Sequence, residues 1–189
     1  MLRAQLKISI LFTLITAIIL GILYPLAVTA IGQLAFAHQA NGQLITRNNQ
    51  IIGSQIIGQT FASDRYFHGR PSAAGNGYDA TSSGGSNYGP SNQKLLARIA
   101  GDVAQYAANG NGQPVPIDLV TASGSGLDSD ISPAAALYQV PRVARVRGLS
   151  NDTVQNLVLS EVQGRQFGLL GEPRVNVLAL NLALDSLAH

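Results

Sequence analysis

The stretch Ile8–Ile31, ISILFTLITAIILGILYPLAVTAI, has 24 residues and no charged side chain. An α-helix rises about 1.5 Å per residue, so about 20 residues cross the hydrocarbon core of a bilayer. The stretch lacks the polar face that a core helix of a soluble protein normally shows. Gly21 and Pro25 would disturb a soluble helix but are tolerated in a membrane-spanning one. We therefore predict one transmembrane helix with a membrane-proximal extension over residues 8–37.

A cleaved signal peptide is the alternative to this anchor. The triplets Val28-Thr29-Ala30 and Ala35-Phe36-Ala37 could serve as cleavage sites. The apolar region of a signal peptide usually has about 7 to 15 residues, however, and this run is far longer. The length favours an anchor.

Basic residues at the start of the chain predict its orientation in the membrane. Arg3 and Lys7 precede the apolar run, whereas no Lys or Arg follows it before Arg47. Lys and Arg are retained on the cytoplasmic side. We therefore expect residues 1–7 to be cytoplasmic in a single-pass protein of the cytoplasmic (inner) membrane. Residues 38–189 should form a soluble domain outside, in the periplasm if there is one.

The composition of the rest of the chain excludes several classes of protein. Beyond Lys7 the chain carries ten Lys and Arg and ten Asp and Glu, so it is neutral and gives no sign of nucleic-acid binding. The absence of cysteine excludes disulfides, thiolate metal sites and a cysteine nucleophile. About 150 residues suffice for a single domain with its own core.

Three capping signals predict helices in this domain. Ser91 or Asn92 should begin a helix that the glycine-rich run 109–112 ends. Ser132 and Pro133 should begin a second helix, which Pro141 should break or kink after Gln139, and a further helical piece could begin there. Ser150 should begin a helix over 151–164.

Short apolar runs predict strands. Ile51-Ile52 and Ile56-Ile57, which flank Gly53-Ser54-Gln55, predict two short strands or one bulged strand, and residues 116–122 and 175–184 each predict a further strand. The fold class is therefore predicted as α+β, with one N-terminal transmembrane helix and a single soluble domain containing a small sheet and several helices. The segment 64–92 shows no periodicity. Such a long irregular stretch is usually functional or disordered, and its aromatic residues favour an ordered loop.

The domain offers few groups for catalysis or metal binding. Of the histidines, His38 adjoins the membrane segment and His189 ends the chain, so His68 is the one credible imidazole. A single histidine is a weak basis for a metal site. Asp128 and Asp130 resemble part of a calcium loop, but the full pattern is missing. No nucleophile elbow and no phosphate-binding loop is present. We predict no catalytic residue and no metal bound by this chain.

Several long runs resemble one family. They are Tyr24-Pro25, Gln39–Gly42, GSQIIGQTF from Gly53, YFHGRPSA from Tyr66, GGSN from Gly84, VTASGSGLD from Val120, ISPAAALYQVPRVAR from Ile131 and VNVLALNLALD from Val175. In this order they resemble the KdpC subunits of high-affinity potassium-transporting P-type ATPases over nearly the whole chain. One departure is Ser129-Asp130, where many members carry Pro-His, so these positions receive no role.

The resemblance implies a non-catalytic accessory subunit of an ATP-driven potassium uptake pump. Its implied partners are a potassium-channel-like subunit and a P-type ATPase subunit, besides membrane lipid. Family members are described as catalytic chaperones that raise the ATP affinity of the ATPase subunit, so the implied cofactor is ATP, acting either directly or through that subunit. The alternative is a membrane-anchored extracytoplasmic binding protein that acts without a pump.

Two sets of site residues follow. For contact with partner subunits we expect residues of the two family runs and two arginines of an Arg cluster: Tyr66, Phe67, His68, Arg70, Gly84, Gly85, Ser86, Asn87, Arg142 and Arg145. A solvated surface is the alternative for the arginines, and plain glycine turns are the alternative for GGSN. If ATP binds directly, the candidates lie in LSEVQGR, which faintly resembles a transporter signature loop: Ser160, Gln163, Gly164 and Arg165. A glycine-capped helix end is the alternative for these four.

Overall fold

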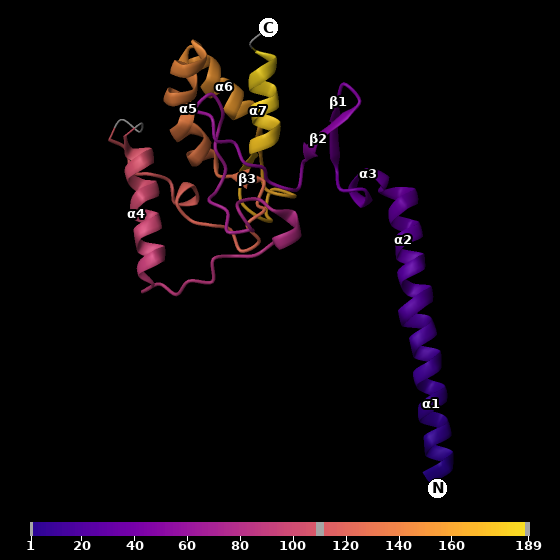
Figure 1. Cartoon of the computed structure of the whole chain (residues 1–189). Coiled ribbons are helices and arrows are strands. Elements are labelled where there is room, and N and C mark those ends of the chain that lie inside the picture. Colours follow the sequence, from indigo (N-terminus) through magenta and orange to yellow (C-terminus); the bar gives the residue numbers. More distant parts are fainter. Residues whose placement is uncertain (1, 109–111, 188–189) are drawn as a thin grey trace. The chain divides into compact units, whose positions relative to one another are not determined.

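The computed structural model describes residues 2–108 and 112–187, in two compact units that divide between Leu44 and Ile45 (Figure 1). The first unit contains a continuous helix from Leu2 to Ala35, followed by a short helix α3 (Ala37–Ala40). The long helix has 34 residues, and its most apolar window of 18 residues has a mean hydropathy of 2.5. Apolarity alone would also suit a signal sequence, but this length and composition fit the anchor of a single-pass membrane protein.

The long helix changes its winding near the middle. It consists of α1 (Leu2–Ile18), the π-helical turn η1 (Ile19–Leu23) and α2 (Tyr24–Ala35). The amide of Tyr24 donates to the carbonyl of Ile19, five residues earlier. The next residue, Pro25, has no amide hydrogen, and its ring would clash with the carbonyl four residues earlier. The wider π turn therefore lies where the proline interrupts the α-helical hydrogen bonds.

A β-hairpin follows, formed by β1 (Leu44–Arg47) and β2 (Gln50–Ser54). Its turn residues Asn48 and Asn49 both have positive φ, 51° and 63°. This is the conformation of a two-residue hairpin turn, and asparagine tolerates it. Of the two short strands, or one bulged strand, predicted here, β2 contains Ile51 and Ile52, whereas Ile57 forms an isolated antiparallel bridge with Ser54.

The core of the second unit lies between three helices and a small sheet. The helices are α5 (Pro133–Arg147), α6 (Asn151–Ser160) and α7 (Val177–Ser186), which lie together in Figure 1. The antiparallel sheet has the order β3-β5-β4, with β3 (Asp130–Ile131), β5 (Arg174–Asn176) and β4 (Val162–Gln163). The predicted α+β class is confirmed.

The predicted helix starts are also confirmed. The side chains of Asn92, Ser132 and Ser150 accept hydrogen bonds from the first turns of α4 (Gln93–Ala107), α5 and α6. The predicted stop of the first of these helices at 109–112 falls largely outside the described residues. Short 3₁₀ turns, η2 (Ala80–Ser82) and η3 (Ile117–Leu119), complete the elements.

The predicted break at Pro141 was wrong, because α5 continues through it to Arg147. The neighbouring side chains of Val140 and Val143 are buried in the core, and this packing outweighs the missing hydrogen bond. Helix α5 ends instead at Gly148, which has a φ of 68°.

Three other element predictions need correction. Residues 116–122 contain the 3₁₀ turn η3 rather than a strand, and the helix from Ser150 ends at Ser160 before β4. The strand predicted over 175–184 is a strand only as far as Asn176, whose side chain caps α7. The apolar residues of α7 also recur at helical spacing, so the same letters fit either structure.

Candidate functional site

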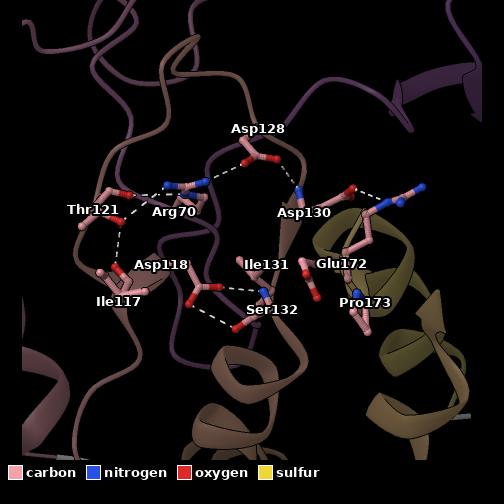
Figure 2. Close-up of a pocket in the computed structure, with 11 residues that line it drawn as sticks. Arg70, Ile117, Asp118, Thr121, Asp128, Asp130, Ile131, Ser132, Glu172 and Pro173 are labelled. Atoms are coloured by element: carbon pink, nitrogen blue, oxygen red, sulfur yellow. Dashed lines mark hydrogen bonds and ion pairs between the residues drawn. The ribbon is translucent and has the colours of Figure 1, made fainter. Parts of the chain in front are cut away.

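An open hollow of about 630 Å³ lies between the long irregular segment and the β3–β5 end of the sheet (Figure 2). We call it the Arg70 hollow. Eleven residues line it: Arg70, Ile117, Asp118, Thr121, Asp128, Asp130, Ile131, Ser132, Glu172, Pro173 and Arg174.

Arg70 is held in place on one side of the hollow. Its guanidinium forms an ion pair with Asp128 at 2.9 Å, and its Nε donates to the carbonyl of Thr121 at 3.3 Å. Behind it, the hydroxyl of Tyr78 donates to the carbonyl of Arg70 at 2.7 Å. Burial and then the carboxylate of Asp128 raise the pKa of Tyr78 to about 12, so the phenol stays protonated and remains a donor. The sequence YFHGR thus places the guanidinium of Arg70 in a fixed position at the surface.

Two carboxylates in the hollow hold the local structure. Asp118 accepts hydrogen bonds from the amide and the hydroxyl of Ser132, at 2.6 and 3.1 Å, and so fixes the start of α5. Asp130 pairs with Arg174 at 2.9 Å and accepts from the side-chain Nδ2 of Asn176 at 2.9 Å, which ties β3 to β5. Both carboxylates therefore have a structural role besides their contribution to the charge of the hollow.

The charges of the hollow are unbalanced. Four carboxylates (Asp118, Asp128, Asp130 and Glu172) and two guanidiniums (Arg70 and Arg174) line it, and Glu172 also pairs with Arg165, so one negative charge remains in excess. Among residues 2–108 and 112–187, no group of three or more His, Asp or Glu side chains is placed to hold a metal ion. Chemically, the hollow is suited to receiving hydrogen-bond donors or a basic side chain.

His68 lies in a second cavity of about 350 Å³, which Tyr78 and Tyr106 line and which shares Arg70 with the hollow. Its ring nitrogen is 3.2 Å from the carbonyl of Ser63, and its backbone exchanges two hydrogen bonds with the side chain of Gln139, at 2.8 and 3.0 Å. Burial, and then the charge of Arg142, lower the pKa of His68 below 6.5, so the neutral ring is favoured. His68 holds its loop on α5.

Two of the residues expected at a partner interface are buried instead. Phe67 is fully buried, and Asn181 of α7 holds both its amide and its carbonyl, at 2.8 and 3.0 Å. Arg142 is 5% exposed and donates to the carbonyls of Asp64 and Tyr66, at 2.6 and 3.0 Å. The expectation that Phe67 and Arg142 contact a partner directly is corrected, because both side chains serve to fix the segment on the core.

The other expected contact residues remain accessible to different degrees. Tyr66, His68 and Arg70 are half-buried, and Arg145 is exposed. The ring of Tyr66 lies 4.7 Å from the guanidinium of Arg147 and its hydroxyl donates to Asp185 at 3.2 Å, so both groups are already engaged.

The GGSN run packs on the second glycine-rich loop of the domain. The amide of Gly84 donates to the carbonyl of Ser125 at 2.8 Å. Gly126 has a φ of +67°, and a Cβ there would lie 2.8 Å from the carbonyl of Gly84, so the close approach requires glycine. Gly85 and Ser86 are half-buried, whereas Asn87 is exposed. Part of this run therefore has a structural role.

The four nucleotide candidates are exposed and line neither cavity. Ser160 ends α6 and donates to the carbonyl of Leu157 at 2.8 Å, while Gln163 belongs to β4. The guanidinium of Arg165 pairs with Glu172 at 2.6 Å. Direct nucleotide binding by these residues and Gly164 stays a prediction.

The connection between β4 and β5, residues 164–173, is a feature that the sequence analysis missed. We call it the finger. At its tip, Phe167, Leu169 and Leu170 are 96%, 78% and 56% exposed. The signal in the sequence was the short apolar run FGLL from Phe167 to Leu170, which the glycines around it make look like an ordinary turn.

Comparison with known proteins identifies the family of this chain. A family model described as "KdpC: K+-transporting ATPase, c chain" matches residues 6–186, and so covers both the long helix and the domain. The chain belongs to the KdpC family. Relatives named potassium-transporting ATPase KdpC subunit include one from Acidobacterium capsulatum, 56% identical over 97% of this chain and 98% of the relative.

Two further KdpC relatives are similar at comparable length. The subunit from Methylococcus capsulatus is 56% identical over 96% of this chain and 97% of the relative. The subunit from Koribacter versatilis is 54% identical over 94% of this chain and 92% of the relative. The family model's range, residues 6–186, spans the segment around Phe67, the Arg70 hollow and the finger.

Proposed function

We propose that this chain is a non-catalytic accessory subunit of a potassium-transporting ATPase, anchored by its N-terminal helix. The observation that carries the proposal is the KdpC family match over residues 6–186, which includes anchor and domain together. Its partners are then the potassium-channel-like subunit and the P-type ATPase subunit of the same pump. The lack of a catalytic role is supported by the hollow, whose Asp118, Asp128 and Asp130 are engaged in structural contacts.

The domain lies on the outer face of the cytoplasmic membrane in this proposal. Arg3 and Lys7 precede the apolar helix, and basic residues are retained in the cytoplasm. Residues 38–189 would then be separated from cytoplasmic ATP by the bilayer.

The proposed effect on the pump is to raise the ATP affinity of the ATPase subunit through coupling. A subunit that contacts one conformation of the pump better than another shifts the balance between them, and so changes affinity at a distant site. This coupling requires no nucleotide on Ser160, Gln163, Gly164 or Arg165. Direct ATP contact at these four exposed residues is the version of the proposal that applies if the domain is cytoplasmic.

The sidedness of the domain tests this proposal. The chain has no cysteine, so single cysteines can be introduced by Ala97→Cys in α4 and by Gln5→Cys before the apolar run as the matched control. A membrane-impermeant thiol reagent should label position 97 in intact spheroplasts and position 5 only after lysis. The reverse pattern would contradict the orientation and favour direct nucleotide binding.

Co-purification tests the accessory role itself. The tagged full-length chain should retain the other pump subunits through affinity and size-exclusion chromatography in mild detergent. A monodisperse chain without pump subunits, recovered from cells that express the whole pump, would contradict the proposal.

A further inference from the structure

We propose that the finger and the Arg70 hollow form one docking surface for another subunit of the same pump. The matching surface on that subunit is an apolar pocket flanked by Lys or Arg. This inference rests on the proposed function, since it names the part of the domain through which the accessory subunit holds its partner.

The tip of the finger exposes an unusual amount of apolar surface. Phe167, Leu169 and Leu170 lie within four residues of one another and are 96%, 78% and 56% exposed. Single exposed apolar residues are normal, but a cluster of them marks an interaction site. An aromatic side chain with leucines beside it also has the composition of an interface anchor.

The finger holds this tip in a fixed shape. The amide of Gln166 donates to the carbonyl of Leu170 and the amide of Leu170 donates to the carbonyl of Gln166, each at 2.9 Å. The amide of Gly168 donates to the carbonyl of Arg165 at 3.1 Å, and the ion pair of Arg165 and Glu172 closes the base at 2.6 Å. A tip that is already ordered loses little conformational entropy on binding.

Phe167 adopts a backbone conformation that is costly for its type. Its φ is 55°, in the left-handed region that bulky residues rarely adopt, and its side chain has no packing there to compensate. Strained positions of this kind cluster at functional sites, where the geometry of the side chain matters. A fixed, strained tip fits a shaped pocket in a protein and has no advantage in a fluid bilayer.

The finger continues directly into the hollow, which supplies the charge. Glu172 and Pro173 line the hollow on the side across from Ile117 and Thr121 (Figure 2). Ile117 is 74% exposed at this rim, so apolar contacts flank the carboxylates. Even with Glu172 paired to Arg165, the excess of carboxylates favours a basic side chain of a protein partner and disfavours the anionic surface of a membrane.

Photo-crosslinking in intact membranes identifies the occupant. A photoreactive phenylalanine analogue replaces Phe167 in the full-length chain, and the same analogue at Leu96, a 46% exposed residue of α4, is the matched control. The expected product joins position 167 to another pump subunit, with at least several-fold less of that product from position 96. Crosslinks to lipid or to a second copy of this chain alone, or equal products from both positions, would overturn the proposal.

Retention of the chain in the purified pump measures the strength of docking. Phe167→Ala should lower retention after size exclusion about tenfold or more, because anchor residues carry most of the binding energy. Leu96→Ala should leave it unchanged, and Glu172→Gln should weaken its sensitivity to salt. Unchanged retention of Phe167→Ala, with the wild-type chain still bound to the pump, would overturn this inference and leave the proposed function standing. Failure of the wild-type chain to co-purify would contradict the proposed function itself.

Discussion

Phe67 and Phe167 both lie in irregular segments with nearby glycines, yet the first side chain is fully buried and the second is 96% exposed. Around Phe67, the core supplies polar side chains that bind the backbone of the segment, with Asn181 and Gln139 each making two such hydrogen bonds. The finger instead bonds only to itself in the contacts described for its tip. Composition alone therefore does not separate a loop that belongs to the core from one that presents a surface.

Truncation of the two phenylalanines gives the largest expected difference. Phe67→Ala should lower the free energy of unfolding of the domain by about 4 kcal/mol, because it leaves a cavity in the core. The same change at Phe167 should alter it by less than about 0.5 kcal/mol, since that side chain is exposed. Tyrosine fluorescence during denaturation of the full-length chain in detergent reports on the domain, since only Tyr24 among the six tyrosines lies in the long helix. Equal losses would show that the finger is packed in solution.

Removal of the Arg142 guanidinium, which binds the backbone of the segment at Asp64 and Tyr66, should have the next largest effect on stability. Arg142→Met keeps much of the buried volume but leaves the carbonyls of Asp64 and Tyr66 without their donor. We expect a loss of about 3 kcal/mol, together with faster amide hydrogen exchange in residues 64–68. Arg145→Met is the control, because Arg145 is exposed on the same helix. If both variants unfold alike, burial of Arg142 does not organise the segment.

Relief of the backbone strain at Phe167 should have the smallest effect on stability, and it should stabilise the domain rather than destabilise it. Phe167→Gly should be about 0.5 kcal/mol more stable than Phe167→Ala, because glycine adopts a positive φ without the steric cost of a Cβ but is more flexible when unfolded. Denaturant midpoints of the two variants test this. A less stable glycine variant would mean that the positive φ is not the preferred conformation of the tip.

The long helix, the α+β class and three helix caps could be predicted, because each depends on local signals: a charge-free run, or a Ser or Asn before an apolar pattern. The path of α5 through Pro141 could not, because it depends on the burial of Val140 and Val143 by distant parts of the chain. Residues 177–184 could not be assigned from the letters either, because their pattern fits a strand and a helix alike.

The candidate site was predictable only in part for a similar reason. The family run YFHGRPSA singled out Arg70, which the structure places in the lining of a hollow, as a partner contact, and this contact stays a prediction. The run gave no means of telling that the nearby Phe67 is buried in the core. The hollow itself joins residues from position 70 to position 174. No local pattern reveals such a set, and the exposure of Phe167 depends equally on what the rest of the chain leaves uncovered.

The π turn Ile19–Leu23 has a consequence for how the anchor meets its neighbours. One extra residue in a helical turn rotates everything beyond it by roughly 100° about the axis, the angle between successive residues of an α-helix. A stripe of side chains that faces one way along α1 is therefore continued on α2 by a different set of sequence positions from those that a uniform helix would place there. A transmembrane segment that lies straight along the anchor would therefore contact α1 and α2 through two different heptad registers, offset by one residue.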